Sequence, residues 1–354
     1  MPAAKPFAIT NATILTAAGP AIEGGTLVVR DGKVVAVGRS VTVPPDAEVV
    51  DAKGRYVTPG IIDSHSHLGV YPAPGVDAHQ DGNEMVKPNT AEVWAEHSVW
   101  PQDPQFPRSS AGGVTTLQVL PGSANLFGGR SVVLKVVPGR SVQEMKFPGA
   151  KYGLKMACGE NPKRVYAERG PMTRMGNVAG YRAAWIKAEQ YRRKWDKWTT
   201  GKQGEIPERD LALETLAEVL RGNILVHNHC YRADEMVQML GVAREFGYQI
   251  RSFHHAVEAY KIADLLDDAQ VSASVWADWG GFKMEALDGV KANAAIVHAA
   301  GGRAIIHSDS PSGIQRLNQE AAKAMAAGNA AGLRITAEDA IKWVTVNPAW
   351  SLGL

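Results

Sequence analysis

Two histidines separated by one residue, His65 and His67, end a short apolar run that begins at Ile61. In a β-strand, alternate side chains point to the same face, so both imidazoles can bind one metal ion. A single pair of this kind is a weak signal. It gains weight when other histidines and an acid also end apolar runs, because imidazole and carboxylate groups are usual ligands of zinc and similar ions.

Three later apolar runs end in side chains of the same kind. These are His227 and His229, then His254 and His255, and finally His307 and Asp309. Burying so many polar groups costs free energy unless something binds them, so the pattern predicts a metal site. His254 and His255 are neighbours in sequence and point to opposite faces of a strand. We therefore expect His255 to face the site and His254 to be structural.

Bulk composition predicts an ordinary globular protein. The chain has 354 residues, of which 45% are hydrophobic and 21% charged, enough for one large α/β domain with a smaller one. The formal net charge is only +2, so nucleic acid and membrane surfaces are not expected partners.

The two cysteines, Cys158 and Cys230, make no disulfide framework and suit a reducing compartment, with a single bond between them as the alternative. The first ten residues contain no apolar stretch of signal-peptide length, and no run approaches the roughly 20 apolar residues of a membrane helix. We expect a cytoplasmic location for the chain as given, and a periplasmic or secreted one if a leader was removed.

Residues 1–58 are expected to form a small antiparallel, β-sandwich-like domain. The apolar runs 26–30 and 33–37 flank Asp31 and Gly32, a dipeptide that accepts the positive φ angles of a two-residue hairpin turn. Residues 49–50 and 56–57 suggest a second pair of short strands.

Residues 59–354 show apolar runs followed by helical periodicity, and they are expected to form a (β/α)8 TIM-like barrel. Strands are predicted near 60–67, 114–120, 131–137, 152–158, 223–229, 249–255, 271–276 and 303–308. Helices are predicted over 233–246, 258–268, 285–300 and 314–327. In such a barrel the carboxyl ends of the strands carry the chemistry.

Two stretches, near 71–110 and 161–207, are expected to be insertions. The first is rich in Pro, Asp and Asn. The second contains a charged helix with Trp185, Trp195 and Trp198, which we expect to dock its aromatic side chains onto the barrel rather than to form a substrate lid.

Four motifs in this order resemble the amidohydrolase superfamily, in the branch of imidazolonepropionase-like proteins and metal-dependent prolidases. The motifs span 59–67, 229–234, 255–261 and 307–309, and the resemblance runs from about residue 7 to the end. Chains of this family normally continue after the barrel with strands that complete the small β domain. Those C-terminal strands are expected to be missing here, which would leave a sheet edge available for a homo-oligomer.

The resemblance implies a role for each matching residue. His65 and His67 would bind the more buried metal ion, while His229 and His255 would bind a second ion. His227 remains a rival to His229. Asp309 would bind metal and carry the proton, and His307 would orient a ligand. The cofactor implied is one or two divalent ions, with Zn expected first and Mn or Fe as alternatives.

The group that bridges two ions in this family is a carboxylated lysine or a glutamate. Lys155 lies within a predicted strand, and Glu160 lies in the turn that follows it. The sequence does not decide which of the two residues is the bridging ligand. It therefore also leaves open whether the site binds one ion or two.

The function implied is metal-dependent hydrolysis of a C–N bond in an amide, a peptide or a cyclic amide. Hydroxide formed by the metal would attack the carbonyl, and Asp309 would pass the proton to the leaving nitrogen. The substrate is expected to be a small or dipeptide-like molecule. Tyr231 and Arg232 could bind its carboxylate, with an ion pair to the following helix as the alternative for Arg232, and Trp276 could shape the pocket.

Two alternatives remain open. One is another metal hydrolase on the same scaffold, acting on a lactone or a phosphoester. Deaminases of the superfamily usually carry a glutamate at the position of Arg232, which argues against deamination. The other alternative is a non-catalytic metal-binding barrel.

Overall fold

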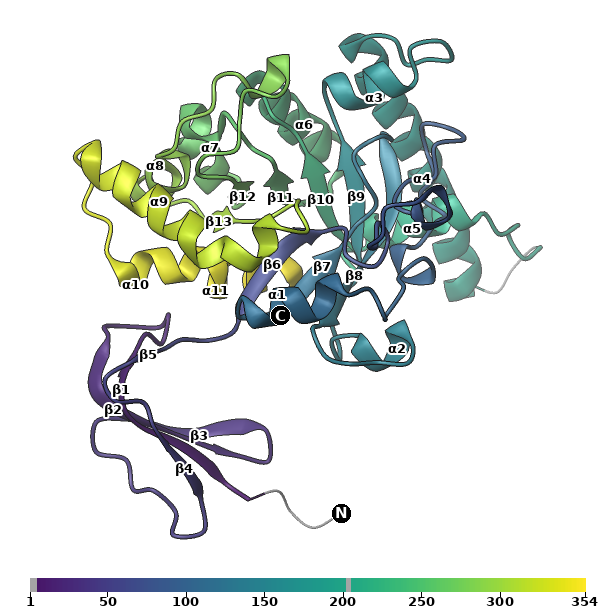
Figure 1. The fold of residues 1–354 in the computed structure, drawn as a ribbon. Helices are drawn as coiled ribbons and strands as arrows, with labels where there is room; N and C mark the ends of the chain where they lie inside the picture. Colours follow the sequence, from purple (N-terminus) through teal and green to yellow (C-terminus); the bar gives the residue numbers. More distant parts are fainter. Residues whose placement is uncertain (1–4, 202–204) are drawn as a thin grey trace.

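The computed structural model describes residues 5–201 and 205–354 and contains two separate β-sheets. Figure 1 shows the small N-terminal sheet set apart from the larger α/β part of the molecule, to which residues near 58–60 connect it. The larger part contains an eight-stranded sheet with helices around it. A mixed α/β fold with a nearly closed barrel and a small sheet is therefore confirmed.

The small sheet contains β1 (Phe7–Ile14), β2 (Ile22–Arg30), β3 (Lys33–Gly38), β4 (Glu48–Asp51) and β5 (Tyr56–Val57). The predicted hairpin is confirmed: β2 and β3 are antiparallel, and the turn residues Asp31 and Gly32 have φ angles of 51° and 73°. The second predicted pair is wrong. β4 and β5 each pair in parallel with β1, because β1 is long enough to take them one after the other.

The larger sheet has the order β13-β12-β11-β10-β9-β8-β7-β6. Its strands are β6 (Ile61–Ser66), β7 (Val114–Val119), β8 (Phe127–Lys135), β9 (Gly153–Ala157), β10 (Leu225–His229), β11 (Ile250–His254), β12 (Ser272–Val275) and β13 (Ala304–Ile306). Each overlaps a predicted strand, and β9 to β13 pair in parallel.

The strand β8 departs from the expected all-parallel barrel. It runs antiparallel to both of its neighbours, β7 and β9. Only residues 120–126 connect β7 to β8, and a parallel crossover needs a dozen or more residues. The short connection therefore forces the chain to turn back, and the first half of the barrel lacks the regular strand and helix alternation.

The larger part also contains helices between and around its strands. They are α1 (Gln105–Ala111), α2 (Val142–Met145), α3 (Glu160–Val165), α4 (Arg174–Gly201), α5 (Leu211–Leu220), α6 (Ala233–Phe246), α7 (Ala263–Asp268), α8 (Asn293–Ala299), α9 (Leu317–Ala330), α10 (Ala337–Ala340) and α11 (Val346–Leu352). Short 3-10 turns are η1 (Asp77–His79), η2 (Ala95–His97), η3 (Ala259–Ile262), η4 (Met284–Ala286), η5 (Gly313–Arg316) and η6 (Ile341–Val344).

The predicted helix 233–246 matches α6 at both ends, while the other three predicted helices begin with a 3-10 turn. The helices α7 and α8 are shorter than predicted, and α9 begins three residues later and ends three residues later than predicted. Among the helices in the described residues, none has the length and apolar character needed to cross a membrane.

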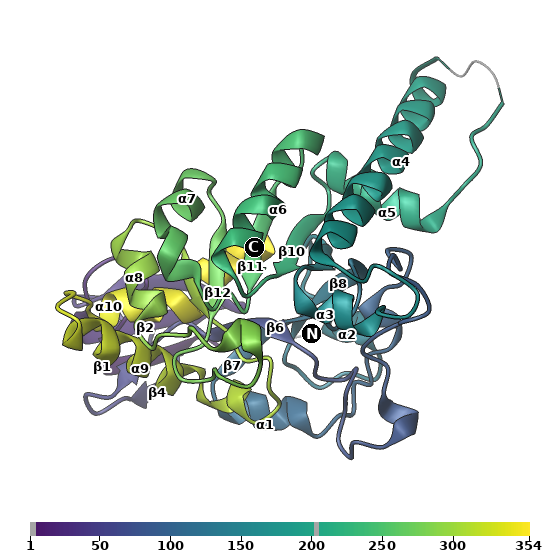
Figure 2. The ribbon, with the colours of Figure 1, turned by 90° about the horizontal axis from the view of Figure 1, so that it is seen from above.

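The predicted second insertion contains the long helix α4, which extends outwards from the barrel in Figure 2. Near its middle, Trp185 is fully buried and its ring packs edge-on to Phe127 at 5.4 Å and against Tyr248 at 4.4 Å. Trp195 and Trp198 lie further along the helix and are only half-buried. The helix thus docks on the barrel through Trp185, as its sequence predicts.

The first and last strands of the eight-stranded sheet, β6 and β13, are connected by side-chain contacts and by a backbone hydrogen bond. The carboxylate of Asp63 accepts from the N–H of Ser308 at 3.1 Å and also from its hydroxyl. The N–H of Asp309 donates to the carbonyl of His65 at 3.1 Å. This seam brings the first and last strands of the barrel together.

Candidate metal centre

His65 and His67 project from the end of β6 toward Asp309, which follows β13. The His67 Nε2 lies 3.1 Å and the His65 Nε2 3.5 Å from Oδ1 of Asp309, and the two Nε2 atoms lie 3.3 Å apart. The His65 side chain is fully buried, while those of His67 and Asp309 are 19% and 24% exposed. These three residues offer ligand atoms that could share one metal ion.

The hydrogen bonds of His67 fix its tautomer. Its Nδ1 lies 2.9 Å from the carbonyl of Leu120, which can only accept, so Nδ1 carries the proton. In a neutral ring, Nε2 then presents a lone pair toward the carboxylate of Asp309. Two acceptors at this separation repel each other unless a proton or a metal ion lies between them.

The same reasoning applies to His255. His307 Nδ1 lies 3.0 Å from the carbonyl of Val275 and must donate to it, so His307 Nε2 accepts from Nδ1 of His255 at 2.7 Å. Nε2 of His255 is left with a lone pair, 3.7 Å from Oδ2 of Asp309. The carboxylate of Asp309 therefore lies between the His65 and His67 pair on one side and His255 on the other.

The expectation that His254 faces away from His255 is wrong. The strand ends at His254, and His255 has a left-handed backbone with φ of 57°, which breaks the alternation of side chains. Both rings consequently contact His65, with centroid separations of 4.9 Å for His254 and 4.4 Å for His255. His254 bonds through Nδ1 to Nδ1 of His65 and through Nε2 to Nδ1 of His227, each at 2.9 Å.

The strands β9 and β10 contribute buried polar groups without partners. Both ring nitrogens of His229 and the Nζ of Lys155 are buried and have no hydrogen-bond partner among the described residues. His229 lies ring to ring with His255 at 5.0 Å. Buried nitrogen atoms without a hydrogen-bond partner are costly in free energy. Their neutral forms offer lone pairs, so a bound cation would account for them.

His227 lies opposite Lys155 in the ladder between β10 and β9. Its Nδ1 is bonded to His254, whereas its Nε2 is also without a partner. His227 therefore has one ring nitrogen engaged, and His229 has none. This difference favours His229 over His227 as a ligand.

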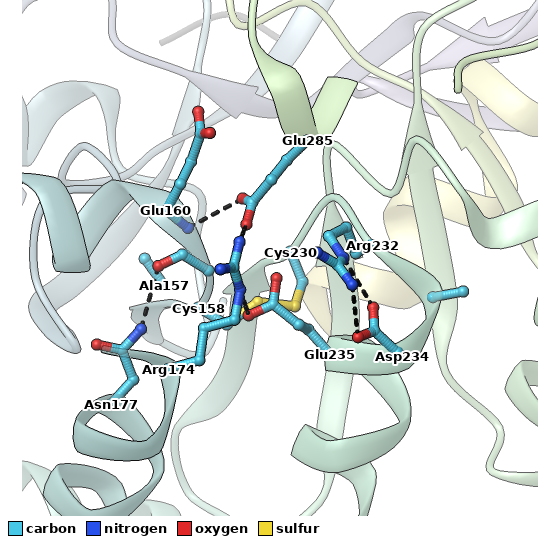
Figure 3. Close-up of a disulfide and its surroundings, with 12 residues drawn as sticks. Ala157, Cys158, Glu160, Arg174, Asn177, Cys230, Arg232, Asp234, Glu235 and Glu285 are labelled. Carbon is cyan, nitrogen blue, oxygen red and sulfur yellow. Dashed lines mark hydrogen bonds and ion pairs between the residues drawn. A yellow bond between two sulfur atoms is a disulfide. The ribbon is translucent and has the colours of Figure 1, made fainter. Parts of the chain in front are cut away.

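Lys155 and Glu160 occupy different kinds of position. Lys155 is fully buried within β9, whereas Glu160 is the first residue of α3 and is only partly buried. The backbone N–H of Glu160 donates to Glu285 at 2.9 Å, and its own side chain extends away from that carboxylate (Figure 3).

Burial controls the electrostatics of the centre. It lowers the pKa values of His65, His229, His254 and His255 well below the usual range, which keeps these rings neutral and able to bind metal. Burial also lowers the pKa of Lys155 to about 7, so that its neutral amine is accessible near neutral pH.

Asp63 is a buried acid to which the sequence reasoning assigned no role. Besides holding Ser308, its carboxylate accepts from the N–H of His65 at 3.2 Å, and burial raises its pKa to about 7. Its position two residues before His65 on one strand face is the signal that could have identified it.

The cysteines that directly follow β9 and β10 form a disulfide, Cys158–Cys230, so the alternative of a single bond is confirmed in place of two reduced thiols. The bond lies next to His229 and three residues beyond Lys155, and it connects the ends of two strands that carry candidate ligands (Figure 3).

The residues expected on the substrate side separate into two groups. Tyr231 is buried with its ring 4.4 Å from that of His229, and Trp276 stacks on His255 at 4.7 Å. Trp276 lines two cavities, of about 220 and 360 Å³, which reach His255 and His307 respectively. Arg232 instead pairs with Asp234 at 2.8 Å near the surface, in agreement with its alternative role of pairing on the following helix.

Comparison with known proteins places this geometry in a family. No established family profile matches the chain. A crystal structure of an amidohydrolase from Thermotoga maritima MSB8 is 36% identical with a TM-score of 0.89, covering 98% of this chain and 89% of that one. A prolidase solved with N-methylphosphonate-L-proline shares the fold at a TM-score of 0.54 and 15% identity.

Among curated proteins, the amidohydrolase tasK of Hapsidospora irregularis is 34% identical over 336 residues, which cover 88% of this chain. An imidazolonepropionase from Symbiobacterium thermophilum is 51% identical over 53 residues, 13% of this chain and 12% of that protein. The chain spans only about a third of the length of tasK, at 34%. By its likeness along almost the whole length of the Thermotoga protein, the chain belongs to the amidohydrolase superfamily of hydrolases.

Proposed function

We propose that this chain is a metal-dependent hydrolase that cleaves a C–N bond in an amide, a peptide or a cyclic amide. The observation that carries the proposal is the set of buried nitrogen atoms without a hydrogen-bond partner, both ring nitrogens of His229 and the Nζ of Lys155, in a centre where ring nitrogens of His67 and His255 face the carboxylate of Asp309. A divalent cation bound there, with Zn expected before Mn or Fe, would supply Lewis acidity that polarises a carbonyl and lowers the pKa of water.

We assign the ligands in two groups around Asp309. His65, His67 and Asp309 would hold one ion, and His229 and His255 would hold a second. Oδ1 of Asp309 lies near His65 and His67, and Oδ2 lies 3.7 Å from Nε2 of His255.

Lys155 is preferred over Glu160 as the bridging group. It lies within β9 and its Nζ has no partner, while Glu160 lies outside the strand. The low pKa of the buried Lys155 amine suits carboxylation or direct ligation, both of which need the neutral form.

Asp309 would move the proton. Its carboxylate is partly open to solvent and touches the ring nitrogens of His67 and His255, so a water on this side is within its reach. It would accept a proton from the attacking water and return it to the leaving nitrogen. Tyr231 and Trp276 would form the apolar walls that hold the substrate against it.

The first test is the metal content of purified, chelator-free protein, measured by elemental mass spectrometry. The His229→Ala variant should lose metal, and His97→Ala is the matched control, because His97 is 69% exposed and lies on η2. Two equivalents per chain that fall only in His229→Ala would support the assignment. Absence of bound metal after reconstitution with Zn and Mn would refute it.

The second test is turnover by the metal-loaded protein on dipeptides, N-acyl amino acids and their amides, with a lactone and a phosphotriester as comparison substrates. Cleavage of C–N bonds with loss of activity on chelation is expected. Activity confined to the lactone or the phosphotriester would replace the proposed reaction by another hydrolysis on the same scaffold.

A further inference from the structure

The connection between β12 and α8 carries a lysine, Lys283, whose ammonium group is directed to the neighbourhood of the metal centre. The side chain is half-buried, and Nζ donates to Oδ1 of Asn161 at 2.7 Å and to the hydroxyl of Tyr231 at 3.3 Å. Nζ also lies 5.3 Å from the ring centroid of Tyr231 and 5.9 Å from that of Phe282. All of these contacts are with neutral groups.

The ammonium group of Lys283 forms no direct ion pair in the part of the chain that the structure describes. Among the described residues, no carboxylate oxygen lies within 4.0 Å of its Nζ, whereas the half-buried Lys146 is paired with Glu96 at 2.7 Å. Burial, followed by the charge of Arg164, lowers the pKa of Lys283, and the more distant charges of Glu160, Asp309 and Glu285 only partly oppose this. Removing a cation from water without a counterion costs free energy. Binding of an anion beside the ammonium group of Lys283 would therefore be favourable.

Lys283 is separated from the candidate ligands by one aromatic ring. The Tyr231 ring whose hydroxyl contacts Nζ lies 4.4 Å from the ring of His229 and 6.1 Å from that of His255. A substrate whose scissile bond lies beside these histidines would extend along the Tyr231 ring to bring its far end to Lys283.

The position of Lys283 is fixed through Glu285, two residues further along. The buried Glu285 carboxylate accepts from the guanidinium of Arg174, at the start of α4, and from the N–H of Glu160, at the start of α3 (Figure 3). Arg174 also bonds Glu235 of α6 at 3.0 Å. The segment carrying Lys283 is thus held by residues of α3 and α4, which preorganises the ammonium group and reduces the entropy cost of binding a ligand.

We propose that Lys283 binds a carboxylate of the substrate, at the end remote from the scissile C–N bond, and makes the site selective for anionic substrates. This inference rests on the proposed hydrolysis and assigns to Lys283 the role that the sequence suggested for Arg232. The guanidinium of Arg232 is already bound by Asp234. Lys283 is a substrate-binding residue in this scheme and takes no part in proton transfer.

The test compares N-acetyl amino acids with their primary amides, which differ only in the carboxylate, by measuring acetate release. The wild-type enzyme should prefer the acids. In Lys283→Met the value of kcat/KM should fall by about ten-fold or more for the acid, mainly through KM, and hardly change for the amide, as expected for a lost hydrogen bond to a charged group. Lys283→Arg should recover part of the loss.

Lys187→Met is the matched control, since Lys187 is an exposed lysine on α4. It should leave both substrates unaffected. An equal loss for acid and amide in Lys283→Met, or a wild-type enzyme that prefers the amides, would overturn the inference.

A separate measurement distinguishes this inference from the proposed function. If the metal-loaded wild-type protein hydrolyses neither these compounds nor the dipeptides of the earlier panel, the proposed hydrolysis fails, and binding of the same acids and amides is then measured by titration calorimetry. Tighter binding of the acids that disappears in Lys283→Met would still support the anion site. Equal binding of acids and amides, or binding of neither, would overturn it.

Discussion

The Nδ1 atoms of His65 and His254 lie 2.9 Å apart in the interior of the barrel. Since His254 also bonds His227 through its other nitrogen, the three rings form a continuous chain in which His254 is the central member. A hydrogen bond to the second nitrogen of a metal ligand fixes the orientation and tautomer of its ring. If His65 binds metal as proposed, His254 is a positioning residue for it.

Replacing His254 with phenylalanine should weaken metal binding by about 10-fold to 100-fold, the usual effect of removing a residue that orients a ligand. Competition with a chelator of known affinity measures the change. His298→Phe is the control, because His298 is half-buried near Asp339 and Trp343, at a different place in the fold. Unchanged affinity in His254→Phe would mean that His254 only fills space.

Replacing Asp309 with asparagine should lower kcat/KM by about 10²-fold to 10⁴-fold, the range for loss of a general acid and base. Metal content should fall less than in His229→Ala, since the amide oxygen of asparagine can still bind a cation. Asp288→Asn, at an exposed acid paired with Lys261, should be close to the wild type in both measurements. Full activity of Asp309→Asn would remove its role in proton transfer.

Because of the disulfide, we expect the free energy of unfolding to depend on redox conditions. Cys158 and Cys230 are 72 residues apart, and a cross-link closing a loop of this size stabilises a protein by roughly 4 kcal/mol in the chain-entropy model. Chemical denaturation with and without a phosphine reductant measures this difference. The double variant Cys158→Ala with Cys230→Ala should resemble the reduced wild type and should not respond to the reductant.

Because of Glu235, we expect the free energy of unfolding to depend on pH. Burial, and then the charge of Glu285, raises the pKa of Glu235 to about 7 in the folded protein, above its ordinary value of 4.5. The folded state therefore holds this proton more tightly than the unfolded state, and the contribution of Glu235 to stability is lost as the pH rises from about 4.5 through 7.

The side chain of Glu235→Gln cannot ionise. The free energy of unfolding of this variant, relative to that of the wild type, should therefore be higher at pH 8 than at pH 5. Unfolding free energies at both pH values test this. Glu245→Gln removes a more exposed carboxylate from the same helix and serves as the control. A difference between Glu235→Gln and the wild type that is the same at both pH values would contradict the prediction.

Much of the barrel could be predicted because its strands and helices follow periodic patterns. Every strand of the larger sheet overlaps a predicted one, and α6 matches at both ends. The reversed direction of β8 could not be read from periodicity, because a strand has the same pattern of side chains in either direction. The short connection 120–126 was the available signal.

The candidate site shows a similar division. The histidines and Asp309 could be proposed from the sequence, because residue type and position at the end of an apolar run can be read without knowing the detailed geometry. The orientation of His254 could not be predicted, because it depends on the single left-handed residue that follows, His255. Lys283 was also missed: it lies far from the histidine motifs in the sequence, on a connection that approaches Tyr231 only in the folded chain.

The seam between β6 and β13 has a consequence for how the protein folds. Asp63 and Ser308, which meet there, are 245 residues apart, and His65 and His67 meet Asp309 across the same boundary. Contacts this distant in sequence form late, because the entropy of the intervening chain opposes them. A nascent chain thus cannot assemble this ligand group until its last barrel strand is in place, and metal captured at that point would lock the closed topology.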